Sequence, residues 1–247
     1  MSNIFITGVS SGVGRQLTKQ YVADGHKVWG VARRKLELQK LSEELGEDSF
    51  HYSVCDVSNE IEIEKTKSEM DSNNFNPDIV ILNAGINPES NNNSFSLIEI
   101  EEVMQTNYLG ALRWIQIFIP FFLEKKQGQF VAISSLNAYR GDSRWIGYSA
   151  SKSALSRSFE SLRGRYADKG LFFTTIHLGA IDTGMGANSS SPFKISPSKA
   201  AKKIIKTISS KKPCKSIPII PRILIGFFRI FTDRLFSKMM NTYRDHK

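Results

Sequence analysis

The chain has 247 residues, of which 40% are hydrophobic and 23% are charged. This composition is typical of one globular domain and excludes a chain that is disordered over most of its length. The net charge of +9 is uneven, because residues 194–247 contain 14 basic and 2 acidic residues, whereas residues 1–193 contain 19 basic and 22 acidic ones. The body of the chain is therefore slightly acidic, which argues against a nucleic-acid-binding domain.

Cys55 and Cys214 are the only cysteines, which excludes a disulfide framework and a four-cysteine zinc site. We therefore expect a reducing compartment and no bound metal. The first apolar run, residues 4–6, is far too short for a secretion signal, and no stretch has the roughly 18 uninterrupted apolar residues that a membrane span needs. The nearest candidate, residues 217–236, contains four charged side chains. These features predict a cytoplasmic protein.

Short runs rich in β-branched and aromatic residues alternate with longer amphipathic segments. Six runs are expected to form strands: residues 4–7, 27–32, 50–55, 79–82, 130–134 and 172–177. Four segments repeat apolar residues at three- and four-residue spacing and are expected to form helices: residues 14–24, 61–73, 98–123 and 148–169. The alternation predicts an α/β fold in one domain, a Rossmann-type doubly wound parallel sheet with helices on both faces.

Two polar stretches interrupt this pattern. Residues 87–96 are expected to form a loop, and residues 184–198 a flexible segment after the sixth strand. Loops that follow the carboxyl ends of parallel strands surround the ligand site of an open α/β sheet. The second segment is therefore either a lid over that site or a surface connection without a role.

A glycine-rich motif lies between the first strand and the first helix, with the sequence Thr7-Gly8-Val9-Ser10-Ser11-Gly12-Val13-Gly14. Glycines allow the backbone to approach a phosphate closely, and the N-terminus of the following helix offers free N–H groups. The spacing G-x-x-x-G-x-G differs from the usual dinucleotide motif G-x-G-x-x-G. The position of the motif after a first strand predicts a nucleotide-binding turn.

The chain resembles the short-chain dehydrogenase/reductase family over about residues 1–185. The resemblance is based on T-G-x-x-x-G-x-G and on four further motifs in the right order: the N-A-G run Asn83-Ala84-Gly85, Asn107 in the following helix, Ser135, and the Y-x-x-x-K pair Tyr148 and Lys152. It implies an oxidoreductase that interconverts a carbonyl and a secondary alcohol, with Asn107, Ser135, Tyr148 and Lys152 as its catalytic residues.

These four residues also have a physical interpretation. Tyr148 and Lys152 share a face if the segment is helical, and an ammonium group beside a phenol should lower the pKa of Tyr148 toward the working pH. Tyr148 can then act as general acid or base, and Ser135 can hydrogen-bond the substrate oxygen where charge develops. The resemblance adds that Lys152 holds the nicotinamide ribose and that Asn107 anchors a water that relays protons.

The choice of cofactor is expected to depend on the residues after the second strand. An NAD-binding enzyme has an acidic residue there for the ribose 2′-hydroxyl, whereas arginine accommodates the 2′-phosphate of NADP. No acidic residue occurs between Asp24 and Glu37, and Arg33 and Arg34 occupy the decisive positions. The sequence therefore predicts NADP(H).

The resemblance implies further cofactor contacts. Asp56 and Val57 would hold the adenine, Asn83, Ala84 and Gly85 the ribose side, and Ile181 and Thr183 the carboxamide and phosphates. The contacts implied within the glycine motif are Thr7, Gly8, Ser10, Ser11, Gly12, Val13 and Gly14, and those of the nicotinamide ribose are Tyr148 and Lys152.

The chain departs from the family pattern at two places. Leu82 replaces the first asparagine of N-N-A-G, and Leu178-Gly179 replaces a Pro-Gly pair after the sixth strand. His177, just before that pair, is expected to pack at the end of the strand and not to act as a base. In residues 136–147, Tyr139 and Trp145 suggest an aromatic substrate wall, while Arg140 and Arg144 either receive an anionic group or face solvent or another subunit.

The C-terminal part resembles the family least. Ser198 is expected to cap a helix over residues 199–209, and residues 217–221 to form a last strand at the sheet edge. From Arg222 onward the apolar residues gather on one side of a helix, which predicts either a helix docked on the body or another subunit, or one that lies on an anionic membrane. We expect a catalytic domain over residues 1–215 and a basic amphipathic extension over residues 216–247.

These observations predict an NADP(H)-dependent reductase of a small carbonyl substrate, which self-associates through residues 98–123 and 148–166. Two alternatives remain at the level of sequence. One is an NADP(H)-binding regulatory protein that keeps the fold without turnover, and the other is a peripheral membrane protein that depends on its basic tail.

Overall fold

The structure, a computed structural model, describes residues 1–88, 95–142, 145–184 and 191–228, with only the backbone described for residues 224–228. Seven parallel strands form one sheet in the order β3-β2-β1-β4-β5-β6-β7. They are β1 Asn3–Thr7, β2 Lys27–Ala32, β3 Phe50–Val54, β4 Ile79–Leu82, β5 Gly128–Ser135, β6 Leu171–Leu178 and β7 Cys214–Ile217. The order reverses between β1 and β4, and the ligand site of a doubly wound sheet lies at such a switch point.

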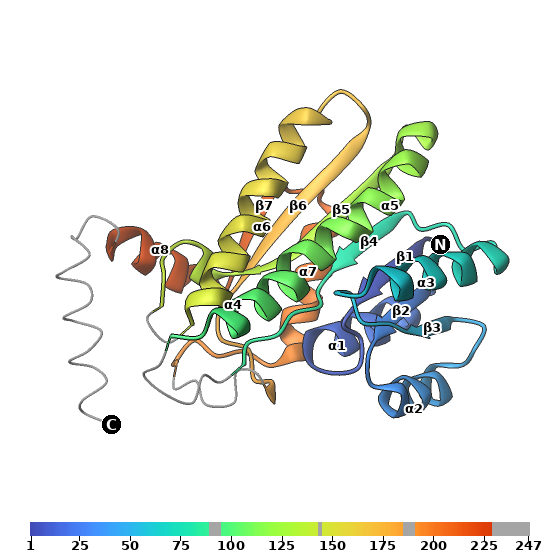
Figure 1. The fold of residues 1–247 in the computed structure, drawn as a ribbon, viewed down its shortest axis with the longest axis horizontal. Coiled ribbons are helices and arrows are strands. Elements are labelled where there is room, and N and C mark those ends of the chain that lie inside the picture. Colours follow the sequence, from blue (N-terminus) through green and yellow to red (C-terminus); the bar gives the residue numbers. More distant parts are fainter. Residues whose placement is uncertain (89–94, 143–144, 185–190, 229–247) are drawn as a thin grey trace.

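Helices cover both faces of the sheet, as Figure 1 shows. They are α1 Gly12–Ala23, α2 Lys35–Leu45, α3 Glu60–Ser72, α4 Leu97–Met104, α5 Gly110–Lys125, α6 Ile146–Arg165, α7 Pro197–Ser209 and α8 Ile219–Phe228. Residues of α1, α2 and α7 share one core cluster, and those of α3, α5 and α6 share the other. The predicted Rossmann-type fold, a doubly wound parallel sheet in a single domain, is confirmed.

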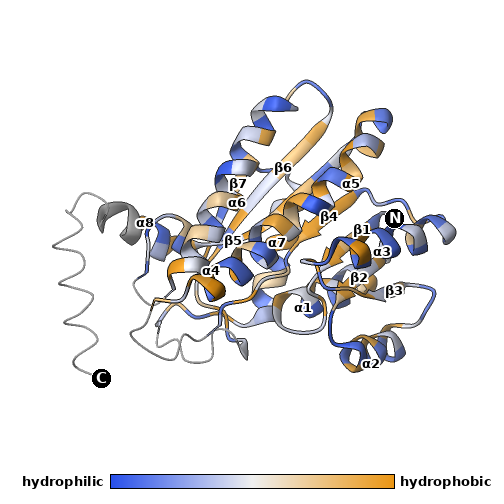
Figure 2. Cartoon of the chain, in the orientation of Figure 1, coloured by the Kyte–Doolittle hydropathy of each residue, from blue (hydrophilic) through white to orange (hydrophobic). Residues whose placement is uncertain are grey.

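The strands are apolar on both sides because each side has its own core. In β1, Ile4 and Ile6 belong to the first cluster, whereas Phe5 between them belongs to the second. Phe5 packs against Trp114 of α5, with 4.4 Å between the ring centroids. Figure 2 shows the same feature as hydrophobic colour along the central strands. This double burial explains the continuous apolar runs in the sequence.

The expected helix over residues 98–123 is divided in the structure. A π-helical turn, η1 Gln105–Leu109, separates α4 from α5. Gly110 follows this turn, and a Cβ there would lie 2.6 Å from the carbonyl oxygen of Val57. The chain therefore changes its helical winding where it passes close to the backbone after β3.

Two C-terminal expectations are corrected. The side chain of Ser196, not Ser198, caps α7, because its Oγ accepts from the Lys199 N–H at 3.3 Å. The last strand is Cys214–Ile217 and not residues 217–221, since Pro218 ends the pairing with β6 and α8 begins at Ile219. The boundary expected at residue 215 falls inside β7. The amphipathic pattern beyond Phe228 lies outside the described residues.

Both expected polar loops are described only in part. Residues 89–94 of the first and 185–190 of the second are not described, so much of the predicted lid lies outside the described residues. Beyond the second gap, Ile195 forms an isolated parallel bridge with Ile181. Within the described residues, none of the helices has the length and apolarity to cross a bilayer.

Candidate functional site

The glycine motif forms a tight turn between β1 and α1. Gly8 and Gly12 have φ values of 76° and 57°, which L side chains rarely adopt. A Cβ on Gly14 would lie 2.2 Å from the Gly8 carbonyl oxygen, so only glycine allows the helix to start this close to the turn. Thr183 packs over the motif, since its Cγ2 lies 3.1 Å from the position of a Cβ on Gly12.

The N-A-G run after β4 is joined to this turn by hydrogen bonds. The Oγ1 of Thr7 accepts from the N–H groups of Asn83 and Ala84 at 3.0 and 2.9 Å. The side-chain amide of Asn83 donates to the carbonyl oxygens of Thr7 and Gly8 at 2.9 and 3.2 Å. These hydrogen bonds therefore join two motifs that are 76 residues apart in the sequence, at the switch point of the sheet.

The N-terminus of α1 fits a phosphate group. Ser11 is its N-cap residue but makes no side-chain capping bond, and the first turn contains no acidic residue. The N–H groups of that turn and the positive end of the helix dipole are thus available to an anion. Val13 is buried beneath this end of the helix, which fixes its position against the sheet.

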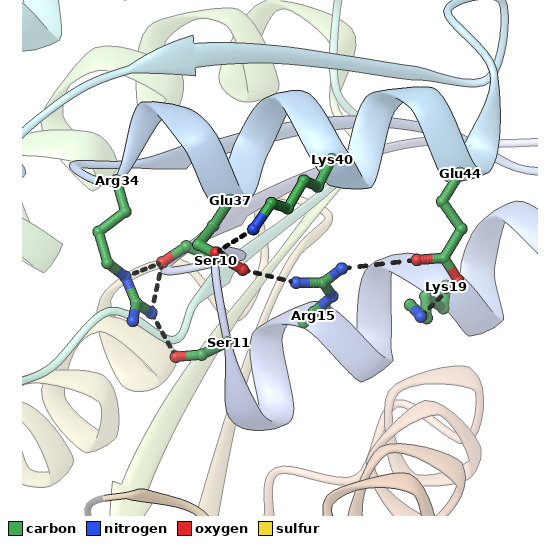
Figure 3. A network of polar contacts seen from close by, with 8 residues as sticks. All are labelled: Ser10, Ser11, Arg15, Lys19, Arg34, Glu37, Lys40 and Glu44. Carbon is green, nitrogen blue, oxygen red and sulfur yellow. Dashed lines mark hydrogen bonds and ion pairs between the residues drawn. The ribbon is translucent and has the colours of Figure 1, made fainter.

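Arg34 extends over the glycine motif, as Figure 3 shows. Its Nε and Nη2 donate to the Oγ of Ser10 at 3.1 and 2.8 Å, and Nη2 also donates to the Oγ of Ser11 at 2.6 Å. Among the described residues, Arg34 has no carboxylate partner within ion-pair distance. A guanidinium held by two hydroxyls beside a helix N-terminus is suited to binding a second phosphate.

Two of the three acidic residues of α2 are paired with other cations (Figure 3). Glu37 accepts from Arg15 at 3.0 Å and from Lys40 at 3.4 Å, and these contacts, Lys40 first, hold the pKa of Glu37 below its usual value. Glu44 pairs with Lys19 and Arg15. Glu37 and Glu44 are therefore already paired with other cations, and neither is bonded to Arg34.

Arg33 and Asp56 meet on the other side of the site. The Nη1 of Arg33 lies 3.5 Å from the Oδ2 of Asp56, while the other oxygen of Asp56 accepts from the N–H and hydroxyl of Ser58 at 2.9 and 2.7 Å. Burial alone would raise the pKa of Asp56, but the bonds from Ser58 and the charge of Arg33 lower it. Val57 is buried next to this pair.

Asn107 and Lys152 converge on Gly85. A Cβ at Gly85 would lie 3.2 Å from the Oδ1 of Asn107 and 3.3 Å from the Nζ of Lys152. Asn107 is buried on η1, where its Oδ1 accepts from the Ile86 N–H at 2.7 Å and its Nδ2 donates to the Ile86 carbonyl at 2.9 Å. Lys152 is also buried, and its Nζ donates to the Ile133 carbonyl at 3.0 Å.

Ser135 and Tyr148 lie together at the end of β5. Ser135 is close enough to Tyr148 to lower its pKa, and the Ser135 Oγ accepts from the Asn137 N–H at 3.2 Å. The Nζ of Lys152 lies 5.8 Å from the centroid of the Tyr148 ring, one helical turn away on α6. The structure thus brings all four predicted catalytic residues to the same edge of the sheet as the glycine motif.

The electrostatics differ from the expectation for Tyr148. Burial raises the pKa of Tyr148, and the bond with Ser135 offsets only part of that rise. Burial also lowers the pKa of Lys152 to about 8. The expected lowering of the Tyr148 pKa by Lys152 is not found, because the ammonium is directed to the Ile133 carbonyl and the phenol is poorly solvated.

The remaining predicted contacts fall in different places. Ile181 is buried in the first core cluster, and its backbone pairs with Ile195. Its side chain therefore packs in the core. Trp145 lies beside Tyr148, with 6.3 Å between the ring centroids, as a substrate wall requires. Tyr139 does not contribute to that wall, because its ring packs between His177 at 4.4 Å and Arg222 at 3.9 Å. Arg144 lies outside the described residues.

His177 is buried at the end of β6, as predicted, within a polar cluster. Its Nδ1 and the Tyr139 hydroxyl are 3.1 Å apart, and its Nε2 and the Ser156 hydroxyl are 3.2 Å apart. Ser156 in turn donates to the carbonyl oxygen of Lys152 at 2.7 Å. Burial, with the charges of Arg222 and Arg163, lowers the pKa of His177 to about 4. Neutral His177 therefore supports α6 behind the catalytic residues.

One supporting residue was missed from the sequence. Ser151 is fully buried, accepts from the Asn107 side chain at 3.1 Å and donates to the Tyr148 carbonyl at 2.8 Å. It therefore links the π-helical turn to the helix that presents Tyr148. Its position directly before Lys152 is the only signal in the sequence, and that signal does not distinguish it from any other serine on the helix.

Together these elements define a dinucleotide-binding α/β protein with a Ser-Tyr-Lys-Asn group at the cofactor edge. A family model described as short chain dehydrogenase matches residues 2–193, and the chain belongs to this family of oxidoreductases. An uncharacterized oxidoreductase of Myxococcus xanthus is 30% identical over 196 residues, which are 76% of this chain and 75% of that protein. The 3-oxoacyl-[acyl-carrier-protein] reductase of Buchnera aphidicola is 28% identical over 179 residues, 72% of this chain and 73% of that one.

Solved structures have the same fold. A short-chain dehydrogenase from Sphingobium yanoikuyae in complex with NADPH superposes with a TM-score of 0.81 at 18% identity and covers 99% of this chain and 96% of its own. A 3-ketoacyl-(acyl-carrier-protein) reductase from Brucella melitensis complexed with NADH has a TM-score of 0.80 at 20% identity. The match covers 87% of this chain and 95% of that one. The fold thus occurs with either cofactor, so the choice depends on local residues.

Proposed function

We propose that the protein is an NADP(H)-dependent oxidoreductase that interconverts a carbonyl and a secondary alcohol and acts mainly as a reductase. The observation that carries this proposal is the convergence of Asn107 and Lys152 on Gly85, together with the proximity of Ser135 to Tyr148. Proton donors and an oxygen-binding hydroxyl are thereby positioned at the edge where the glycine motif would hold a dinucleotide.

NADP(H) is favoured over NAD(H) by Arg34. Its guanidinium is held by Ser10 and Ser11 close to the N-terminus of α1, where it can bind a 2′-phosphate. Arg33 adds a second cation, although its pairing with Asp56 leaves it less free. The short-chain dehydrogenase from Sphingobium yanoikuyae, which has the same fold, was solved in complex with NADPH.

In the proposed reaction, bound NADPH supplies the hydride. Tyr148 donates the proton to the substrate oxygen, and its raised pKa keeps it protonated at neutral pH, as a general acid requires. The Ser135 hydroxyl donates a hydrogen bond to the same oxygen as negative charge develops. Lys152 would bind the ribose, and Asn107 would anchor the water through which Tyr148 is reprotonated.

Replacement of Tyr148 tests the assignment. Tyr148→Phe should abolish NADPH oxidation with a panel of carbonyl compounds, by about 100-fold or more, because the ring remains and the proton donor is lost. Binding of NADPH, measured by quenching of protein fluorescence, should stay within a few-fold. Carbonyl turnover at the unaltered rate by the variant would contradict the role of Tyr148.

Tyr52→Phe is the matched control for Tyr148→Phe. Tyr52→Phe removes a hydroxyl from β3, at the far end of the sheet from α6, and should leave turnover unchanged. A protein that binds NADPH but reduces no member of the panel would favour a binding function over the proposed reductase.

A further inference from the structure

The two cysteines of the chain lie in opposite surroundings. Cys55 is buried in the second core cluster, and burial raises the pKa of its thiol to about 12, which makes this thiol unreactive. Cys214 is exposed at the start of β7, which is the last strand in the sheet, and no described strand pairs with its outer side. Cys214 is therefore the cysteine that a reagent in solution can reach.

The thiol of Cys214 belongs to a cluster of polar side chains between the sheet and α6. Its Sγ lies 3.6 Å from the Nδ1 of His177 and 3.8 Å from the Tyr139 hydroxyl. The Tyr139 hydroxyl is also 3.1 Å from the same Nδ1. A neutral imidazole nitrogen has at most one free lone pair, so the hydroxyl and the thiol compete for it. The contact of Tyr139 is the shorter one, which leaves the thiol only weakly bonded.

Thr175 adds a hydroxyl without a partner to this cluster. Its Cα is paired in register with that of Cys214, and it lies two residues before His177 on β6, so all three side chains are on the same face of the sheet. Thr175 is 2% exposed, and its Oγ1 has no hydrogen-bond partner among the described residues. A buried hydroxyl normally finds an acceptor. Negative charge on the neighbouring sulfur supplies one.

Two guanidinium groups make the surroundings of the sulfur positive. Arg222 packs on the Tyr139 ring, 3.9 Å from its centroid. Arg163 donates to the carbonyl oxygen of Pro213, the residue before Cys214, at 2.6 Å. In the part of the chain that the structure describes, neither arginine has a carboxylate within ion-pair distance. An anionic reagent is therefore attracted to this sulfur more strongly than a neutral one.

We propose that Cys214 is a modification site that forms a mixed disulfide with an anionic disulfide of low molecular weight. The thiol loses its proton to solvent, and the thiolate attacks one sulfur of the reagent. A bond forms between that sulfur and the Sγ of Cys214, the disulfide bond of the reagent breaks, and the released thiolate takes up a proton. The Cys214 sulfur is oxidised and the released sulfur is reduced, so no other oxidant is needed. The Thr175 hydroxyl donates to the negative charge that the sulfurs share during the exchange.

Glutathione disulfide, whose two halves are each anionic at neutral pH, is the reagent for the first test. By intact-mass spectrometry the full-length protein should gain one glutathionyl group, which a thiol reductant removes, and peptide mapping should locate it at Cys214. Cys214→Ser should gain none. Cys55→Ala is the matched control and should react like the unaltered protein, and thermal melting should show that both variants are folded. An adduct at Cys55, or no adduct at all, would overturn the proposal.

Rates of adduct formation test whether the cluster contributes. The protein should react at least about fivefold faster than a synthetic peptide of residues 211–217, which keeps the local sequence but lacks the Thr175 hydroxyl. Thr175→Val should remove this advantage, and Thr175→Ser should restore it. Arg222→Gln should slow the reaction with glutathione disulfide by about two- to fivefold, but not the reaction with neutral 2-hydroxyethyl disulfide. A protein that reacts no faster than the peptide, or variants with unchanged rates, would show that Cys214 is only an accessible thiol and would refute the site.

Discussion

At the scale of single residues, the proposed preference for NADP(H) depends on Arg34. The fold of the relatives is found with NADPH and with NADH, whereas the guanidinium of Arg34 is positioned by two hydroxyls of the glycine motif. The sequence predicted its importance from the absence of an acidic residue after the second strand. It did not predict the bonds to Ser10 and Ser11, because these depend on how closely the β2–α2 connection approaches the turn.

Replacement of Arg34 should therefore change affinity for one cofactor only. In Arg34→Ala, we expect the Kd for NADPH to rise by about 10- to 100-fold, since one or two charge-assisted hydrogen bonds are lost, and the Kd for NADH to change little. Fluorescence titration with both cofactors measures this. Lys40→Ala, which removes a cation already bonded to Glu37, is the control. An equal loss for both cofactors would show that the 2′-phosphate is bound elsewhere.

Lys152 should set an upper pH limit on the proposed carbonyl reduction. Its pKa is lowered to about 8 by burial, so the ammonium is present below that pH and is lost above it. If the charged form is needed, kcat/KM for carbonyl reduction should fall as pH rises through about 8. Steady-state rates between pH 6 and pH 10, about the range in which Lys152 titrates, would show this fall in kcat/KM.

The variant Lys152→Arg tests whether the fall in rate is caused by loss of the positive charge at position 152. Its guanidinium stays protonated at high pH, so the fall near pH 8 should disappear even if the overall rate is lower. The same fall in the variant would assign the titration to another group.

At the scale of elements, the order of strands and helices could be predicted because apolar periodicity reports burial directly. Helix α2 was not predicted, since only Leu38, Leu41 and Ser42 of its 11 residues are buried and the apolar stripe is short. The π-helical turn was not predictable either. It depends on the contact of Gly110 with Val57 and on the bonds of Asn107 to Ile86, and both partners are distant in sequence.

The π-helical turn is expected to be a stability element as well as a catalytic one. Asn107→Ala should lower the free energy of unfolding by about 1–3 kcal/mol, because the N–H and carbonyl of Ile86 lose their partners in a partly buried place. Ser151→Ala removes two bonds, to Asn107 and to the Tyr148 carbonyl, against the three that Asn107 makes, and should have a smaller effect. Urea unfolding of both variants measures the difference, and a larger loss for Ser151→Ala would contradict this account.

At the scale of the whole molecule, the catalytic edge depends on buried polar contacts between distant parts of the chain. Tyr139, after β5, packs with Arg222 of α8 and meets His177 of β6, which continues through Ser156 to the helix of Lys152. The sequence predicted His177 as a structural residue from its place at a strand end. Its partners Tyr139, Ser156 and Cys214 are spread over 75 positions of the chain, and no local pattern specifies them.

His177 should make the protein sensitive to acid. Its pKa is about 4 in the folded chain and 6.5 in the reference state, so its contribution to stability is complete above pH 6.5 and declines as pH falls toward 4. The loss is on the order of 3 kcal/mol.

His177→Gln removes this titration, so its free energy of unfolding, measured in urea from pH 7 downward, should fall less steeply than that of the unaltered protein. His51→Gln, which alters a histidine on β3, should keep the steep decline. Parallel curves for His177→Gln and the unaltered protein would show that acid acts on another group.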